Sequence, residues 1–464
     1  MTAVQSGIAE VLHTEPVRSA VTDPAADAAT RADDRGHVFH SWSAQKAIDP
    51  VPVAGGVGSR FFDYAGHSYL DFGSQLVNLN LGHSHPDLIA AIRAQADRLS
   101  TIQPSFANDV RGTLARLITE RAGDSFSHVF FTNAGTEANE HAIRLAKLHT
   151  GRHKVMAAYR SYHGGTAASM ALTGEPRRWG SEPGFGGVVH FHGPYLYRSP
   201  FHSASPEQET ERALEHLRQT VVFEGPHTIA AIVLESVVGT NGVLVPPPAY
   251  LAGVRAICDE FGILYIADEV MVGFGRLGEW FGVHAYDVRP DLITFAKGVN
   301  SGYVPLGGVV INADIVATFD DRPYPGGLTY SGHPLACAAG VASIDVFERD
   351  GILQRVRRMG SEVIGPELAA MAERHPRIGE VRGLGAFWAI EFVSDPASKE
   401  PLVPFNAAGA AMAPMNAIVA ACKKRGVWPF LGGNRIHVAP PLIATDDEVR
   451  EGLAAIDEAL TETG

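Results

Sequence analysis

The sequence predicts an α/β protein in which a mostly parallel β-sheet lies between layers of helices. Short apolar segments alternate with segments of helical spacing through the middle of the chain, which is the pattern of strand–helix–strand units. Several of the apolar segments contain almost no polar residue, as expected of strands covered by helices on both faces. After Ser331 the pattern changes to a long helical run, which predicts a second, smaller α+β domain.

The elements of the predicted sheet follow one another in order. The helices are assigned where apolar residues recur at helical spacing, as Ala138, Ala142 and Ala146 do, and the strands where short apolar runs occur. We predict strands at residues 127–132, 154–159, 228–235, 262–268, 292–296 and 307–311, and helices at residues 137–148, 248–261 and 334–348.

Four regions are expected along the chain. Residues 1–36 lack clear periodicity and are predicted to be a flexible N-terminal arm. Residues 75–340 hold the alternating pattern and form the predicted large domain. Residues 37–74 and 341–464 are assigned to the smaller domain, which both ends of the chain would build. Ligands of parallel sheets bind at the carboxyl ends of the strands, so the functional residues are sought there.

Composition excludes several kinds of partner. The 464 residues carry a formal net charge of -13, which argues against nucleic acid or an anionic membrane as the main partner. The three cysteines lie far apart, so we expect no disulfide framework and no metal site, and a reducing cytoplasm as the location. No apolar stretch approaches the roughly 20 residues that a membrane span needs.

Lys297 ends the apolar segment at residues 292–296, and Gly298 follows it. A lysine at the end of a buried strand loses hydration, which lowers the pKa of its ammonium group and leaves a neutral amine that can attack a carbonyl. Taken alone, such a lysine is more often one that extends from the strand end to water.

Other residues at predicted strand ends favour a functional role for Lys297 over a side chain that only extends to water. Gly135 and Thr136 open a helix directly after a strand, where free N–H groups and the helix dipole suit a phosphate. Tyr162 precedes two glycines and could stack on a flat ring. Asp268 ends a strand 29 residues before Lys297, about one strand–crossover–strand unit, and Val270 is expected on the same face.

Each of these features also has an ordinary structural explanation. The first is a plain helix N-cap, the second a glycine turn, and the third a strand-end acid bonded to an amide. Together, however, they suit pyridoxal phosphate. Lys297 would bind the cofactor covalently, and Asp268 would keep its pyridine nitrogen protonated so that the ring accepts electrons.

At the level of motifs, the chain resembles the class III, or omega, aminotransferases among the fold-type I pyridoxal-phosphate-dependent transferases. The resemblance starts near residue 37 and runs through most of the chain. The matching segments are GHSHP at 82–86, FFTNAGTEANEHAIRLAK at 130–147, YHGG at 162–165, ADEVMVGFGRLG at 267–278, FAKG at 295–298 and TYSGHPLACAA at 329–339.

The resemblance implies roles for the matching residues. Lys297 would be the Schiff-base lysine that carries the cofactor as an internal aldimine and transfers protons, with Asp268 and Tyr162 as its catalytic partners. The cofactor-binding residues would be Gly135, Thr136, Tyr162, Glu235, Asp268, Val270, Lys297 and Thr329. Thr329 would reach the phosphate in the neighbouring subunit, so the resemblance implies a homodimer with shared active sites.

The implied activity is transamination in two ping-pong half-reactions. A primary (omega) amine or amino acid gives its amino group to the cofactor, and a keto acid or aldehyde such as pyruvate then accepts it. Two other hypotheses stay open: a lyase or aminomutase on the same scaffold, which the motifs do not separate from a transaminase, and a non-catalytic cofactor-binding module.

Three departures from the family pattern bear on the substrate. Met271 stands where the branch that acts on 4-aminobutyrate and ornithine usually has Gln, which favours the amine–, taurine– or beta-alanine–pyruvate branch. Val77 replaces a Trp of many amine–pyruvate enzymes and would widen the pocket. Phe430 stands near the place of a substrate-carboxylate arginine, and Arg435 is the nearest arginine, so both are candidate substrate residues together with Val77.

Overall fold

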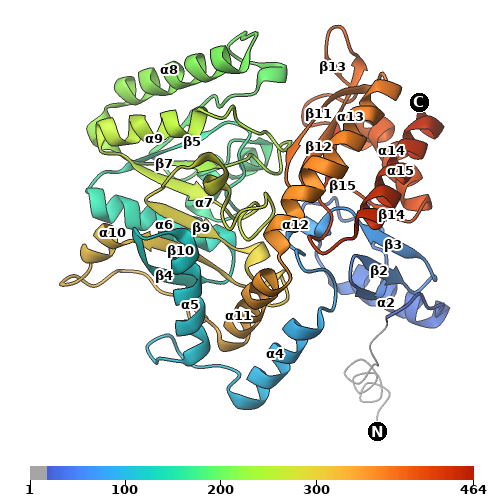
Figure 1. Cartoon of the computed structure of the whole chain (residues 1–464), viewed down its shortest axis with the longest axis horizontal. Coiled ribbons are helices and arrows are strands. Elements are labelled where there is room, and N and C mark those ends of the chain that lie inside the picture. Colours follow the sequence, from blue (N-terminus) through green and yellow to red (C-terminus); the bar gives the residue numbers. More distant parts are fainter. Residues whose placement is uncertain (1–17) are drawn as a thin grey trace.

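A computed structural model describes residues 18–464 (Figure 1). The predicted N-terminal arm therefore falls partly outside the described residues. Within them, Pro24–His37 form helix α2, an element that the sequence analysis did not predict. The side chain of Asp23 accepts hydrogen bonds from the amides of Ala25 and Ala26, and proline suits the first helical turn. The helix has no buried residue, which explains why the sequence shows no apolar periodicity there.

The large domain is built on a seven-stranded sheet in the order β4-β10-β9-β8-β7-β5-β6. The β10 strand is antiparallel to both its neighbours, and β9, β8, β7, β5 and β6 run parallel to one another. All six predicted strands are present, whereas β6 was not predicted. The strands are β4 (Phe126–Thr132), β5 (Lys154–Ala158), β6 (Val188–Phe191), β7 (Ile229–Glu235), β8 (Leu264–Asp268), β9 (Leu292–Phe295) and β10 (Gly307–Asn312).

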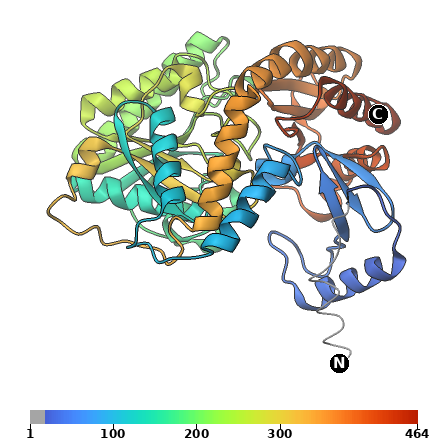
Figure 2. The same cartoon turned by 60° about the horizontal axis from the view of Figure 1, so that its bottom comes forward.

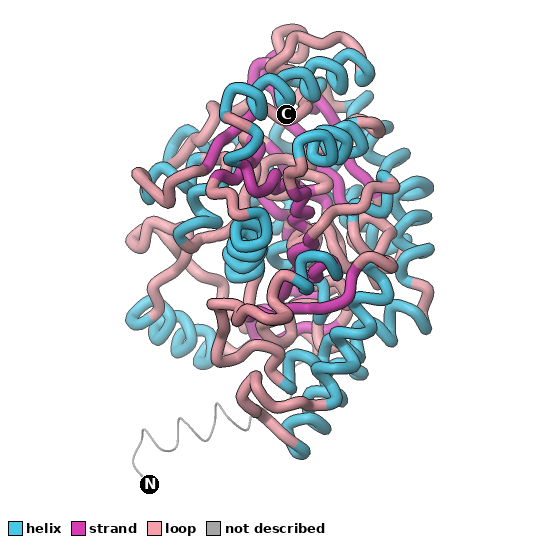
Figure 3. The backbone as a smooth tube through the Cα atoms, turned by 90° about the vertical axis from the view of Figure 1, so that its left-hand side faces the viewer, coloured by secondary structure: helices cyan, strands magenta, loops and turns pink. Residues whose placement is uncertain are grey.

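Helices cover both faces of this sheet, as predicted (Figure 3). The β7 strand shows why its sequence is almost wholly apolar. Its Ala231 and Val233 pack on the side of α6, while Ile232 and Leu234 pack on the side of α8 and α9. One face carries α6 (Gly135–Thr150), α7 (Ala167–Leu172) and α10 (Ala313–Ala317), and the other carries α5 (Asp109–Ala122), α8 (Pro206–Glu224), α9 (Tyr250–Phe261) and α11 (Pro334–Arg349).

The smaller α+β domain is formed by both ends of the chain, as predicted (Figure 2). The β14 strand pairs in parallel with β3, so that Val427 lies beside Leu70. One sheet has the order β1-β2-β3-β14 and another has β11-β12-β16-β15, with β13 beside β12. The strands are β1 (Val53–Val57), β2 (Arg60–Asp63), β3 (Ser68–Asp71), β11 (Ile378–Leu384), β12 (Phe387–Asp395), β13 (Glu400–Pro401), β14 (Val427–Trp428), β15 (Phe430–Gly432) and β16 (Arg435–Val438).

Helices of the C-terminal part pack on these sheets and share one core with Phe72 and Leu70 from the N-terminal part. They are α12 (Ile352–Arg358), α13 (Gly365–Arg374), α14 (Ala413–Lys424) and α15 (Asp446–Thr463). The predicted border between residues 340 and 341 lies inside α11, which continues to Arg349. The segments α3 (Ser74–Val77) and α4 (Pro86–Arg98) lead from the first part of the small domain into the large one.

Arg276 ties the two domains together through a fully buried side chain. Its guanidinium group donates to the carbonyl oxygens of Ala386 and Pro440 and to the side chain of Asn80. Burial lowers the pKa of this guanidinium to about 9.

Over residues 18–464, no helix combines the length and the apolar character that crossing a membrane requires.

Candidate active site

A cavity of about 330 Å³ opens at the carboxyl ends of β8 and β9, beside the start of α6. This is the edge of the sheet at which ligands of α/β proteins bind. The structure brings most of the predicted cofactor-binding residues together around it. Its walls include Gly135, Thr136, Tyr162, Glu235, Asp268, Val270 and Lys297.

Lys297 enters the cavity directly after β9. The strand ends at Phe295, and Lys297 begins a 3-10 turn with a φ of 44°, a backbone conformation that is uncommon for a residue with a side chain. Burial lowers the pKa of its ammonium group to about 8, although the carboxylates of Asp268 and Glu235 act in the opposite direction. The side chain therefore has access to its neutral, nucleophilic form near physiological pH.

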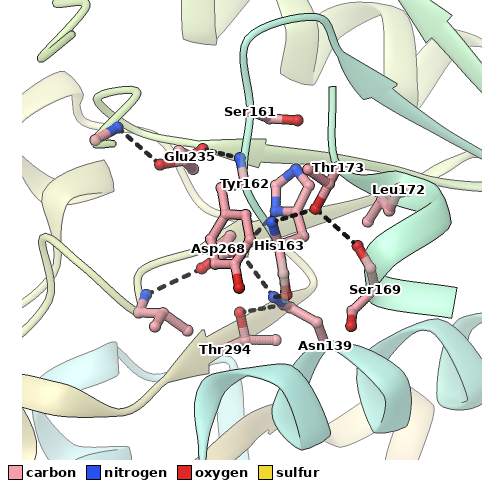
Figure 4. Close-up of polar contacts among 12 residues, drawn as sticks. Asn139, Ser161, Tyr162, His163, Ser169, Leu172, Thr173, Glu235, Asp268 and Thr294 are labelled. Carbon is pink, nitrogen blue, oxygen red and sulfur yellow. Dashed lines mark hydrogen bonds and ion pairs between the residues drawn. The ribbon is translucent and has the colours of Figure 1, made fainter. Parts of the chain in front are cut away.

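Asp268 ends β8 and is held by three hydrogen bonds (Figure 4). Its Oδ2 lies 2.7 Å from Nδ1 of His163 and accepts from Nδ2 of Asn139 at 2.8 Å. Its Oδ1 accepts from the backbone amide of Val270 at 3.1 Å. Val270 thus lines the same cavity as Asp268, but from the turn that follows β8 rather than through strand alternation.

Asn139 and His163 are functional candidates that the sequence reasoning missed. Asn139 lies four residues after Gly135 on α6, and its Nδ2 also donates to the carbonyl oxygen of His163. Its Oδ1 accepts from Thr294 on β9, so the amide bridges three segments. The available signal was their position inside the AGTEANEH and YHGG segments, which follow the predicted strands at residues 127–132 and 154–159.

The start of α6 forms another part of the cavity wall. Ala134, the N-cap residue, supplies no side-chain hydrogen bond, so the first N–H groups of the helix have no capping side chain. Gly135 has to be a glycine, because a Cβ atom there would lie 2.6 Å from Cγ1 of Val270. Thr136 Oγ1 accepts from the amides of Gly165 and Thr166. Such a helix start suits a phosphate group.

Glu235 and Tyr162 form the third wall. Glu235 ends β7 next to Asp268 in the sheet register, and its two oxygens accept from the amides of Tyr162 and Gly239. Burial, together with the neighbouring Asp268, raises the pKa of Glu235 to about 7. The ring of Tyr162 lines the cavity and carries the guanidinium of Arg177 at 3.7 Å from its centroid.

These features fit pyridoxal phosphate. A carboxylate that two side chains orient can pair with a ring nitrogen, an uncapped helix start can bind the phosphate, and a lysine with a lowered pKa lines the same cavity. Within residues 18–464, no group of three or more histidine, cysteine, aspartate or glutamate side chains is arranged to hold a metal ion.

The remaining predicted residues do not line this cavity in the described chain. Thr329 is exposed, in the loop before α11. Val77 is buried and packs in a cluster that Met271, a residue of the cavity wall, also contacts. The Phe430 ring packs on His437, with ring centroids 5.0 Å apart. Arg435 is half-buried at the start of β16, and loss of hydration lowers the pKa of its guanidinium to about 10.

Comparison with known proteins places the chain in a family. Residues 43–460 match the family Aminotransferase class-III. The chain is 33% identical to the uncharacterized aminotransferase YhxA of Bacillus subtilis (strain 168), over 90% of this chain and 93% of that protein. It is likewise 33% identical to a probable 4-aminobutyrate aminotransferase of the same organism, over 87% of this chain and 92% of that protein.

Solved structures agree with the sequence relatives. The taurine:2-oxoglutarate aminotransferase from Bifidobacterium kashiwanohense, in complex with PLP and glutamate, is 38% identical with a TM-score of 0.91, over 95% of this chain and 99% of that one. A PLP-bound amine transaminase from an uncultivated Pseudomonas species is 32% identical with a TM-score of 0.88, over 92% and 99%. The chain therefore belongs to the class III aminotransferases, enzymes that transfer amino groups with pyridoxal phosphate as cofactor.

Proposed function

We propose that this aminotransferase takes its amino group from a primary amine that is not alpha to a carboxylate, and that Lys297 is its catalytic lysine. One observation carries the assignment of the lysine: Lys297 and Asp268 leave neighbouring parallel strands and face one cavity with the uncapped start of α6. For the donor class, support comes from Met271 in the cavity wall and from relatives named for taurine, 4-aminobutyrate and amines.

In this proposal the chain's own residues have distinct tasks. Pyridoxal phosphate, when bound, supplies a ring that accepts electrons from the substrate carbon. Asp268, held by His163 and Asn139, would pair with the ring nitrogen and favour its protonated, positively charged form. Lys297 would hold the cofactor covalently, and its free Nζ atom would accept and return a proton. Tyr162 and Val270 would contact the ring, and Gly135 and Thr136 would hold the phosphate.

We further propose a homodimer with shared active sites. Thr329 is exposed and lies outside the cavity of its own chain, on a surface that also exposes Tyr330 and Phe106. Arg111 brings these segments together by donating to the carbonyl oxygens of Phe106 and Ser331. A second subunit would cover these aromatic side chains and place Thr329 at the partner's phosphate. We also propose a reducing, cytoplasmic location. The free, buried thiols of Cys258, Cys337 and Cys422 fit such a compartment.

A half-reaction assay tests the donor class. The holoenzyme is mixed with taurine, beta-alanine, 4-aminobutyrate or 1-phenylethylamine in the absence of a keto acid. We expect at least one of these amines to convert the cofactor's visible absorbance to that of its amine form, with one carbonyl product per cofactor. Pyruvate and 2-oxoglutarate are then tested as acceptors that reverse the change. Ammonia released in repeated turnovers without an acceptor would instead favour a lyase, and an inert cofactor would favour a binding module.

A further inference from the structure

A second cavity, of about 360 Å³, lies behind the wall formed by Glu235. It is bounded by the ends of β5 and β7 and by the start of α9. Apolar side chains, among them Leu234, Leu244 and Leu251, form much of its wall. Of the residues that line it, only Glu235 also lines the cofactor cavity, so the two spaces are neighbours rather than one chamber.

Arg160 is the arginine in the wall of this cavity that lacks an ion-pair partner in the described chain. Its side chain makes a cation–π contact with Tyr195, at 5.1 Å from the ring centroid, and forms no ion pair with a carboxylate among residues 18–464, although Glu391 is near enough to act on its charge. Burial lowers the pKa of this guanidinium; Tyr195 and Glu391 act in the opposite direction, and the nearby arginines Arg198 and Arg382 lower the pKa further. The other two arginines of the cavity are already paired, Arg198 with Glu391 and Arg178 with Glu182.

The charges around Arg160 do not balance. The interacting group contains the arginines Arg160, Arg198, Arg382 and Arg435 but only the acids Glu380 and Glu391, a formal excess of two positive charges. The acids in the cavity wall are engaged elsewhere: Glu235 by the amides of Tyr162 and Gly239, and Glu175 by Arg177. A guanidinium that is partly removed from water without an acid partner is costly unless an anion binds it.

We propose that this cavity is a second binding site, distinct from the cofactor site, for a small organic carboxylate with an apolar body. Arg160 binds the carboxylate, because a guanidinium presents a planar set of donors that matches it. The leucine side chains contact the apolar body, and the volume of the cavity lies within the range of small-molecule sites.

Calorimetry with the holoenzyme tests this site, with phenylacetate as the probe and phenylacetamide as its neutral isostere. We expect phenylacetate to bind at least about tenfold more tightly, since a hydrogen bond to a charged group contributes about 1.5–3 kcal/mol. Arg160→Gln should abolish this preference. The matched variant Arg178→Gln, at an arginine of the same cavity that is already paired, should keep it.

Gly193→Val provides a test that leaves every charge in place. Gly193 lines the cavity, and a Cβ atom there would meet only Ala158, at an ordinary 3.6 Å. The larger side chain should weaken phenylacetate and phenylacetamide alike. Equal affinity of the wild-type enzyme for the two probes would overturn the proposal. So would competition between phenylacetate and the amine donor or keto acid, because the probe would then occupy the active site.

Discussion

At the scale of single residues, Lys297 combines a strand-end position with a pKa lowered to about 8. Below that pH the ammonium form dominates and cannot attack the cofactor. We therefore expect the rate at which cofactor-free protein forms its covalent link to rise about tenfold per pH unit up to about pH 8 and then level off. Stopped-flow absorbance measures it, with Nα-acetyl-lysine as the reference amine. A midpoint near 10.5 would show that the fold leaves this lysine unperturbed.

Glu235 offers an internal control for this pH profile. Its carboxylate raises the pKa of Lys297, so Glu235→Gln removes that contribution. The midpoint of the same rate profile should then move to lower pH. A midpoint that stays in place would mean that the two groups do not interact.

Gly135 is a second residue whose identity the geometry requires. In Gly135→Ala the new methyl carbon would lie 2.6 Å from Cγ1 of Val270, well inside the normal contact distance of about 3.5–4.0 Å. The start of α6 has to shift, and we expect cofactor affinity to fall at least about tenfold, consistent with an overpacking cost of about 1–3 kcal/mol. Equilibrium titration with the cofactor measures this loss.

Gly112→Ala is the matched control for that substitution. Gly112 lies within α5, and a Cβ atom there meets nothing within 4 Å. Alanine at this position should leave cofactor affinity unchanged and stabilise the protein by about 0.5–1 kcal/mol. If both variants bound the cofactor like the wild type, Gly135 would not be needed for close approach.

At the scale of elements, the N-terminus of α15 has a capping box. The Thr445 side chain accepts from the amide of Glu448, whose carboxylate accepts from the amide of Thr445. Thr445→Ala should lower the free energy of unfolding by about 1 kcal/mol in a urea titration. Thr461→Ala is the control, since that hydroxyl bonds only to a carbonyl oxygen of its own helix and its loss should cost much less. Equal losses would argue against the cap.

The elements also show what the sequence could and could not predict. The β7 and β8 strands were predictable because burial on both faces leaves almost continuous apolar runs. In contrast, β6 is a four-residue edge strand with three half-buried residues, and β1 is short and glycine-containing, so neither gives a clear pattern. The α2 helix depends on its Asp23 cap rather than on an apolar face.

Some residues of the candidate site were also predictable from local sequence patterns, and others were not. Lys297, Asp268 and Gly135 were predictable because each stands at the end of an apolar run or the start of a helix. The bond between Asn139 and Asp268 joins residues 129 positions apart, and it depends on how α6 packs over β8 and β9. Such a partner follows from tertiary packing, which local sequence patterns do not contain.

At the scale of the whole molecule, the proposed dimer makes a prediction about Thr329. Sedimentation should give twice the 49.5 kDa mass of the chain. Thr329→Ala should weaken cofactor retention about tenfold, since a bond to a charged phosphate contributes about 1.5–3 kcal/mol. Tyr324, in the same loop, bonds within its own chain to His141, so its variant Tyr324→Phe is the control. A fully active monomer would contradict the shared site.

The most direct test of the account is to locate the lysine that binds the cofactor. The holoenzyme is reduced with borohydride, which fixes the lysine–cofactor link, and is then digested and mapped by mass spectrometry. We expect the added mass on the peptide that contains Lys297, in one copy per chain, and none on the other six lysines. Stoichiometric modification of a different lysine, such as Lys147 or Lys154, would contradict the assignment of the active site.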